Sequence, residues 1–231
     1  MLKNTLINRA AVRKIAQALG KKNKKAVYVG GAIVSFYIDD PSAEDVRPTK
    51  DIDISMEIAS LSKLEQIREE LNRKGFYQSS EDNVICRFRY EDIKVDVMST
   101  KAVGWAPANP WFEPGYQHLI SFAMDDVEIR CLSLPYYLAT KFTAFYDRGI
   151  SDPRTSHDFE DIVYLLNYTT DWLTQIITSD DEVKQYLIKC FSDILMDSAK
   201  QEAILGNLFH EEQDYRFSKI INQLRQVCHV R

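Results

Sequence analysis

Three aspartates on two alternating segments are the residues of this chain best suited to chemistry. In "KDIDIS", Ile52 and Ile54 alternate with Asp51 and Asp53, and "IKVDVM" places Asp96 between valines in the same way. On a β-strand this alternation sends apolar and acidic side chains to opposite faces. If the two strands are neighbours on one core, the three carboxylates converge, and their mutual repulsion favours a bound cation. Oxygen ligands without cysteine or histidine favour Mg²⁺ or Mn²⁺. The alternative is three unrelated surface aspartates.

Two consecutive glycines precede these acids. Gly30 and Gly31 end the hydrophobic segment 27–29, and a helix is predicted behind them over 32–38. A strand, a glycine pair and a helix present unhindered backbone amides and a positive helix end, which suits phosphate. A tight structural turn is the other interpretation of the same pattern. Glycine pair, Asp-x-Asp and a third aspartate in this order are more specific than either part alone, and together they predict a site for a metal–triphosphate.

The elements that must position these residues form a mixed sheet covered by helices. Helices are predicted over the first 20 residues and from a capping box at Ser62 and Glu65 to Gly75. Strands are predicted at 27–29, 51–56, 84–90, 93–99 and near 127–131, with 84–99 as a hairpin, and residues 100–115 as a loop. Ser133 begins a further helix, and the chain is helical after 156. The predicted class is α+β, with a catalytic domain over 1–132 and an all-α bundle over 133–231.

Composition and charge narrow the class of protein. The 231 residues are 45% hydrophobic and 27% charged, typical of a globular protein, and no apolar run approaches the roughly 20 residues of a membrane helix. Four scattered cysteines are predicted to be reduced core thiols of a cytoplasmic protein. A net charge of −5 argues against a broad sequence-independent grip on nucleic acid. The local basic loop "KKNKK", residues 21–25, is either a solvated turn or a phosphate contact.

The motifs resemble a known family. "VGG", "RPTKDIDI" and "KVDV" are similar to the pattern of the DNA polymerase beta-like nucleotidyltransferase superfamily, although the gap between Gly31 and Asp51 is longer than usual there. "LATKFTAFYDRGISDPRTSHDFEDIVYLL" resembles AbiEii-like nucleotidyltransferases, the toxins of type IV toxin–antitoxin systems. The resemblance covers roughly residues 27–167. It implies that Arg47 and Thr49 belong to the first acidic motif and bind nucleotide.

Lys141, Asp158 and Asp161 carry the second part of the resemblance. Lys141 flanks an apolar stripe on the helix that begins at 134, so its ammonium either reaches outward to solvent or faces an anion. Asp158 and Asp161 share one face of the next helix. On residues alone, Asp158 can complement the helix dipole and Asp161 can pair with a nearby base. The resemblance implies that Lys141 binds the nucleotide's phosphates and that one aspartate orients it or contacts ribose or base.

The implied activity is Mg²⁺-dependent transfer of a nucleoside monophosphate from a nucleoside triphosphate to an acceptor hydroxyl, with release of pyrophosphate. Two metal ions, Mg²⁺ or Mn²⁺, are expected on Asp51, Asp53 and Asp96, and Asp96 is the candidate to deprotonate the acceptor. The resemblance points to a toxin acting on tRNA, with a cognate antitoxin and no membrane. Two alternatives stay open: a degenerate nucleotide-binding antitoxin or regulatory module, and an enzyme that modifies a small-molecule hydroxyl.

Overall fold

Two units, each with its own core, make up the computed structural model, which describes residues 2–148 and 152–229. One comprises Met1–Phe36 and Glu44–Ser133 and is called the sheet unit below. The other comprises Tyr37–Ala43 and Leu134–Arg231 and is called the helical unit. The short segment Tyr37–Ala43 therefore belongs with residues that follow it by about a hundred positions or more.

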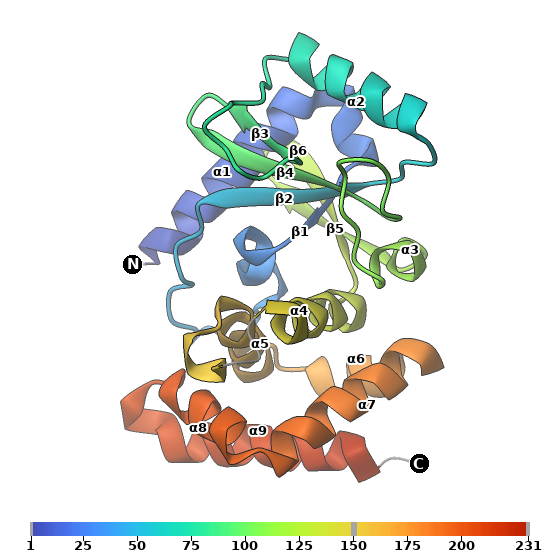
Figure 1. Cartoon of the computed structure of the whole chain (residues 1–231). Coiled ribbons are helices and arrows are strands. Elements are labelled where there is room, and N and C mark those ends of the chain that lie inside the picture. The colour runs from blue at the N-terminus through green and yellow to red at the C-terminus, as the bar shows by residue number, and fades with distance from the viewer. Residues whose placement is uncertain (1, 149–151, 230–231) are drawn as a thin grey trace. The chain divides into compact units, whose positions relative to one another are not determined.

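The sheet unit is built on one mixed sheet of six strands in the order β3-β4-β2-β1-β6-β5 (Figure 1). The strands are β1 (Val27–Val29), β2 (Asp51–Met56), β3 (Arg87–Tyr90), β4 (Ile93–Ser99), β5 (Leu119–Met124) and β6 (Val127–Leu132). β2 runs parallel to β4 and β1 parallel to β6, while the other neighbours are antiparallel. The predicted α+β class with a small mixed sheet is confirmed. β5 was not predicted, and β3 begins three residues later than expected.

One face of this sheet is apolar and buried. Ile52 and Ile54 of β2 and Val95 and Val97 of β4 are all buried, as the alternation predicted. Helix α1 (Lys3–Leu19) buries Val12, Ile15 and Leu19, and α2 (Leu61–Arg73) buries Leu64, Ile67 and Leu71. In Figure 1 both helices are drawn on the same side of the strands. The opposite face is thereby left for the aspartates.

Three local predictions are wrong. Helix α2 is capped by Ser60, whose hydroxyl accepts a hydrogen bond from the Lys63 amide, and Ser62 lies inside the helix. The segment behind the glycines is a 3₁₀ helix, η2 (Gly31–Tyr37), rather than the predicted α-helix. The predicted loop 100–115 contains the short helix α3 (Phe112–Gly115). The second of these corrections matters for the site, because a short 3₁₀ helix does not supply the dipole of a long α-helix.

The helical unit consists of α4 (Leu134–Arg148), α5 (His157–Tyr168), α6 (Trp172–Ile177), α7 (Asp181–Met196), α8 (Ser198–Gly206) and α9 (Gln213–His229). Its core includes Phe142 and Phe145 of α4 and Phe191 of α7, all fully buried. Two short 3₁₀ turns, η3 (Pro153–Thr155) and η4 (His210–Glu212), connect these helices. The predicted helical C-terminal part is confirmed.

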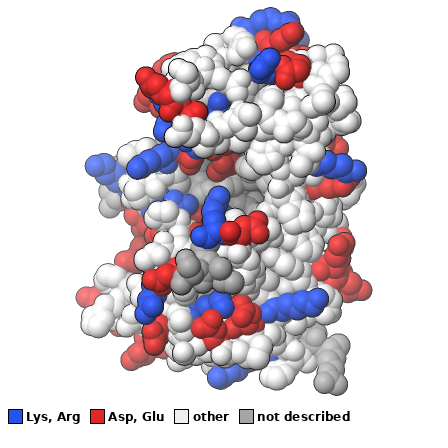
Figure 2. Space-filling view, viewed as in Figure 1, with Lys and Arg blue, Asp and Glu red and all other residues white. Residues whose placement is uncertain are grey.

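Charged side chains of both signs lie on the described surface. Lys and Arg side chains are interspersed with Asp and Glu on the face drawn in Figure 2. Among the described residues no helix is long and apolar enough to cross a membrane. Cys86, Cys131 and Cys190 are buried free thiols, as predicted, whereas Cys228 is half-buried.

Candidate active site

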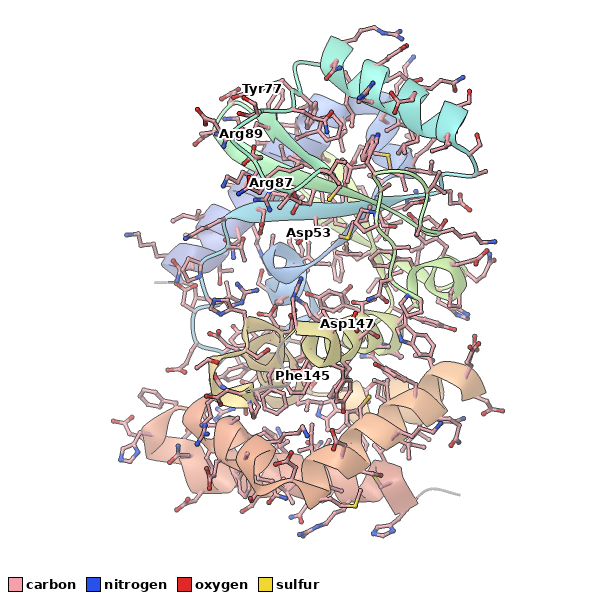
Figure 3. The ribbon with its side chains drawn as sticks, viewed as in Figure 1. Asp53, Tyr77, Arg87, Arg89, Phe145 and Asp147 are labelled. Carbon is pink, nitrogen blue, oxygen red and sulfur yellow. The ribbon has the colours of Figure 1, made fainter. Side chains whose placement is uncertain are left out.

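A row of side chains crosses three strands on the polar face of the sheet. Asp53 of β2 lies opposite Asp96 of the parallel strand β4, and Asp96 lies opposite Arg87 of the antiparallel strand β3. Figure 3 labels Asp53 and Arg87, the two ends of this row. Asp51 is two residues before Asp53 and so projects from the same face. The predicted convergence of the three aspartates depended on the pairing of β2 with β4. This pairing is present.

Arg87 is the residue that sequence reasoning missed. Its Nε and Nη2 donate to the two carboxylate oxygens of Asp96, each over 2.7 Å, and Nη2 also donates to Asp51 over 2.8 Å. The hydrogen bonds that Arg87 donates to Asp96, followed by the charges of Asp96 and Asp51, raise the pKa of Arg87 despite its partial burial. One guanidinium therefore pairs with two of the three predicted metal ligands. A two-residue hairpin turn fixes register, so "RFRYEDIKVD" contained this pairing.

The lack of a side chain at Gly30 leaves room for the carboxylate of Asp53. The glycine has φ +72°, a left-handed conformation in which a side chain is strained. A β-carbon built at this position would lie 1.8 Å from Oδ2 of Asp53 and 2.6 Å from its carboxyl carbon. Because the carboxylate occupies the space of the missing side chain, a residue with a β-carbon fits here only if Asp53 moves.

A side chain at Gly31 would likewise come too close to Arg47 and Thr49. A β-carbon there would lie 2.3 Å from Nη2 of Arg47 and 3.2 Å from the methyl group of Thr49. Asn8 of α1, which is buried, holds this segment from behind. Its amide nitrogen donates to the Arg47 carbonyl over 3.3 Å, and its carbonyl accepts from the Thr49 hydroxyl over 3.3 Å. Asn8 is a second residue that sequence reasoning missed, since a polar residue on a helix carries no signal of its own.

The chemistry of the donor set suits a hard cation. Carboxylate oxygens are the ligands that Mg²⁺ and Mn²⁺ prefer. Burial, with a contribution from Asp96, raises the pKa of the neighbouring Cys86 thiol to about 11, so no thiolate competes at this place. Within the described part of the chain, no three His, Cys, Asp or Glu side chains are arranged to hold a metal ion. Around Asp51 and Asp96 the positive charge is supplied by Arg87 instead.

A cavity of about 330 Å³ borders this site in the sheet unit. Thr49, Lys50 and Asp51 line it from the acidic strand, and Asn8 and Lys14 are among the α1 residues on its other wall. Its volume is at the lower end of the range for ligand pockets. Of the predicted site residues, Thr49 and Asp51 line this hollow.

Lys141, Asp158 and Asp161 form a second group, in the helical unit. The Lys141 ammonium donates to Asp161 over 2.5 Å, and the two side chains are only 5% and 4% exposed. Asp158 lies 3.7 Å from the same ammonium and accepts from Arg148 over 2.8 and 3.2 Å. Two interpretations of Lys141 were open, and the second holds: its ammonium faces anions and not solvent. Arg148 is a third residue that was not singled out from the sequence.

Comparison with known proteins identifies what the chain is similar to. A model of the family described as nucleotidyl transferase AbiEii toxin, type IV toxin–antitoxin system, matches residues 18–226. The crystal structure of an antigenic nucleotidyltransferase-like protein from Paracoccidioides brasiliensis shares the fold, with a TM-score of 0.52 at 16% identity over 85% of this chain and 91% of that chain. None of the curated proteins matches. The family match extends the resemblance from residues 27–167 to almost the whole chain.

Proposed function

The chain belongs to the AbiEii nucleotidyl transferase toxin family of type IV toxin–antitoxin systems, and we propose that it transfers a nucleoside monophosphate from a nucleoside triphosphate to an acceptor hydroxyl. The observation that carries this proposal is the registered row of Asp53 and Asp96 beside Gly30. Carboxylates and a bare backbone turn are the two groups that a metal-bound triphosphate needs at one place.

We propose that the glycine turn and the side chains of Arg47 and Lys141 bind the nucleotide's phosphates. Gly30 and Gly31 leave their backbone open to close approach, and Arg47 and Thr49 lie directly against Gly31. Lys141 is proposed to give the same triphosphate a point charge. Asp161 would act as a positioning residue, because it fixes the direction of the Lys141 ammonium. Asp158 would in turn be held by Arg148.

Asp51, Asp53 and Asp96 are proposed to hold divalent cations, Mg²⁺ or Mn²⁺. When bound, such ions supply charge neutralisation for the triphosphate and for the entering and leaving oxygens. In the reaction the acceptor oxygen forms a bond to the α-phosphorus, and the bond from that phosphorus to the bridging oxygen breaks, so pyrophosphate leaves with the electron pair. Asp96 is proposed to accept the proton of the attacking hydroxyl.

For the acceptor we propose tRNA, in the cytoplasm, with the toxin controlled by a cognate antitoxin. The family's toxin–antitoxin context supports the antitoxin. The net charge of −5 favours the second candidate, a small-molecule hydroxyl, because a small acceptor needs no extended basic surface. A nucleotide-binding module without activity is less well supported, since binding alone does not require three aspartates on one face.

The test is transfer of label from α-labelled nucleoside triphosphates. Purified protein is incubated with each nucleotide and total RNA, in Mg²⁺ or in EDTA. We expect labelled RNA in Mg²⁺ only, and none with Asp53→Asn. Asp92→Asn is the matched control, because Asp92 is an exposed acid of the same sheet unit. Labelling that survives EDTA, or that is equal in the two variants, would contradict the proposal.

A further inference from the structure

A basic pocket lies in the sheet unit, away from the aspartates. It is lined by five cationic side chains and one acid, with an apolar floor: Lys22, Lys24, Lys25, Lys63, Arg130, Glu57, Met56 and Ile67. Its volume is about 230 Å³. In a chain of net charge −5, five cations around one small hollow are a marked local concentration of positive charge.

Elements from four parts of the chain converge to build this pocket. The 3₁₀ helix η1 (Gly20–Lys25) contributes three lysines, α2 contributes Lys63, and β6 contributes Arg130. The loop is held in place by Asn23, which is buried among these lysines. Its amide donates to the Glu128 carbonyl over 2.7 Å, and its side-chain oxygen accepts from the Tyr28 hydroxyl over 2.9 Å. The lysines on either side of Asn23 are therefore carried by an anchored backbone and not by a free turn.

Among the described residues, most cations of the pocket have no hydrogen-bond or ion-pair partner, although the charge of Lys63 also acts on Glu70. Lys22 pairs with Glu70. For Lys24, Lys25, Lys63 and Arg130, no side-chain hydrogen bond or ion pair is formed with any residue in the described ranges 2–148 and 152–229. The Nε of Arg130 is moreover fully buried without an acceptor. A buried donor without a partner is unfavourable, because it has lost its water and gained nothing in return.

We propose that this pocket is a second phosphate-binding site, separate from the nucleotide site. A phosphate group supplies what the pocket lacks: several negative oxygens that accept from lysine ammonium groups and from a buried arginine N–H at once. The class of ligand is a phosphate monoester or diester. It comes either from the backbone of an acceptor RNA strand or from a free phosphate compound.

The position of the pocket favours the backbone of a strand. Glu57, the residue after β2, follows Asp53 by four residues, which at about 3.3 Å per residue places the pocket roughly 13 Å from Asp53. A small acceptor cannot occupy both places. Stacked nucleotides advance about 3.4 Å each, so a strand with its end at the aspartates has a phosphate near the pocket about four nucleotides on. The assignment to an acceptor strand rests on the proposed function, whereas the phosphate site itself does not.

The experiment measures binding without nucleoside triphosphate. A fluorescein-labelled single-stranded RNA of twelve nucleotides is titrated by anisotropy at several salt concentrations, and inorganic pyrophosphate is titrated by calorimetry. The variants are Lys25→Glu/Lys63→Glu and Arg130→Met. The matched control is Lys189→Glu/Arg225→Glu, which makes the same charge change at two exposed positions of the helical unit.

For the double variant we expect RNA affinity to fall ten- to a hundredfold. The slope of log affinity against log salt should shrink by about 1.4, from roughly 0.7 for each lost phosphate contact. The control should stay within twofold. Arg130→Met should weaken RNA binding without lowering the melting temperature, because it removes a buried donor that has no partner in the free protein. Weaker RNA binding with an unchanged melting temperature would show that Arg130 binds a ligand and does not merely stabilise the fold.

The outcomes also separate the two sources of phosphate. Loss of RNA binding in the pocket variants assigns the site to a strand. Pyrophosphate binding that the same variants abolish, with no effect on RNA, assigns it to a free phosphate compound. Equal RNA affinity, salt slope and pyrophosphate binding in wild type and both pocket variants would overturn the proposal. Both titrations contain no nucleoside triphosphate, so failure of the transfer reaction and failure of this site are seen in different measurements.

Discussion

The carboxylate of Asp53 fills the space that a side chain at Gly30 would need, with Oδ2 only 1.8 Å from where a β-carbon would lie. The aspartate that we assign to metal is thus positioned by the absence of a side chain on the neighbouring strand. Glycine at this position does more than permit a turn, because it leaves room for the Asp53 carboxylate beside the end of β1.

Gly30→Ala should therefore be both unstable and inactive. Strain at φ +72° and the displaced Asp53 should lower the free energy of unfolding by about 1–3 kcal/mol, measured by urea denaturation. Gly206→Ala is the control, because a β-carbon at Gly206 meets no atom within 4 Å. Equal stability of the two variants would mean that Asp53 can move aside without cost.

Gly31→Ala should behave differently from Gly30→Ala. The nearest atom to the new β-carbon is the tip of Arg47, a flexible side chain that can shift, and φ at Gly31 is not in the left-handed region. We expect stability within about 0.5 kcal/mol of wild type. Affinity for the Mg²⁺–nucleotide complex should fall, because Arg47 is displaced. Native affinity, measured by calorimetry, would separate Gly31 and Arg47 from the nucleotide site.

Arg87→Met should change the response to Mg²⁺. Without the guanidinium, Asp51 and Asp96 lose their resident counter-ion, so the metal-free protein should lose roughly 1.5–3 kcal/mol of stability. Added Mg²⁺ should then raise the melting temperature more than it does in wild type. Arg89→Met is the matched control on the same strand, because Arg89 pairs with Asp82 and not with the predicted metal ligands. The same Mg²⁺ response in both variants would show that Arg87 and the cation do not compete.

Lys141 and Asp161 should be energetically coupled. Lys141→Met leaves Asp161 as a buried charge without its closest partner, at a cost of about 3–5 kcal/mol. The double variant Lys141→Met/Asp161→Asn should recover much of that stability and none of the transfer activity. Chemical denaturation gives the first quantity and the labelling assay the second. Restored activity in the double variant would show that the lysine does not contact the nucleotide.

Asp45 should make stability depend on pH. It caps α1 from forty residues away, accepting from the amides of Asn4 and Thr5 over 2.7 and 2.8 Å. Burial opposes its ionisation, but these hydrogen bonds prevail and hold the pKa of Asp45 below its ordinary 3.8. Because the folded pKa is the lower one, the contribution is present above pH 3.8 and is lost as pH falls below that value through the folded pKa.

The measurement is the melting temperature of wild type and Asp45→Asn from pH 7 to pH 3. At pH 7 the variant should be less stable by about 0.5–2 kcal/mol, the usual value of a helix cap. The difference should narrow toward pH 3. A constant difference over the whole range would mean that the charge of Asp45 does not matter.

The acidic strands were predictable because their alternation is a local property. Isoleucine and aspartate at successive positions define a face whatever the rest of the chain does, and β1, β2 and β4 formed where expected. Arg87 was equally predictable in principle. Glu91 and Asp92 make a two-residue turn, and the register that follows from it sets Arg87 opposite Asp96. The prediction considered only the acids of this hairpin and so did not include Arg87.

Other features depend on contacts that no local pattern records. β5 was missed although its turn, Asp125–Asp126, resembles the Glu91–Asp92 turn of the other hairpin: both lack the usual glycine, and Asp125 adopts a positive φ as Glu91 does. Asn8 and Asp45 act on partners about forty residues away. The α2 cap is Ser60 and not Ser62, although Ser60 has Lys63 three residues later and so lacks the capping-box pattern that favoured Ser62.

The membership of Tyr37–Ala43 in the helical unit has a consequence during synthesis. Ser42 and Asp40 of this segment bind Arg216 of α9, and Ser42 precedes Arg216 by 174 residues. At about 5–20 residues per second, a ribosome takes roughly 9–35 s to deliver that arginine. Throughout this interval the stretch that links the glycine turn to the Asp-x-Asp strand is without this anchor. The nascent chain thus carries its acidic strand long before α9 can fix Asp40 and Ser42 in the connection that leads into that strand, although Asp45 and Arg47 of the same connection already have their partners on α1. Complete folding is therefore delayed until α9 has been made.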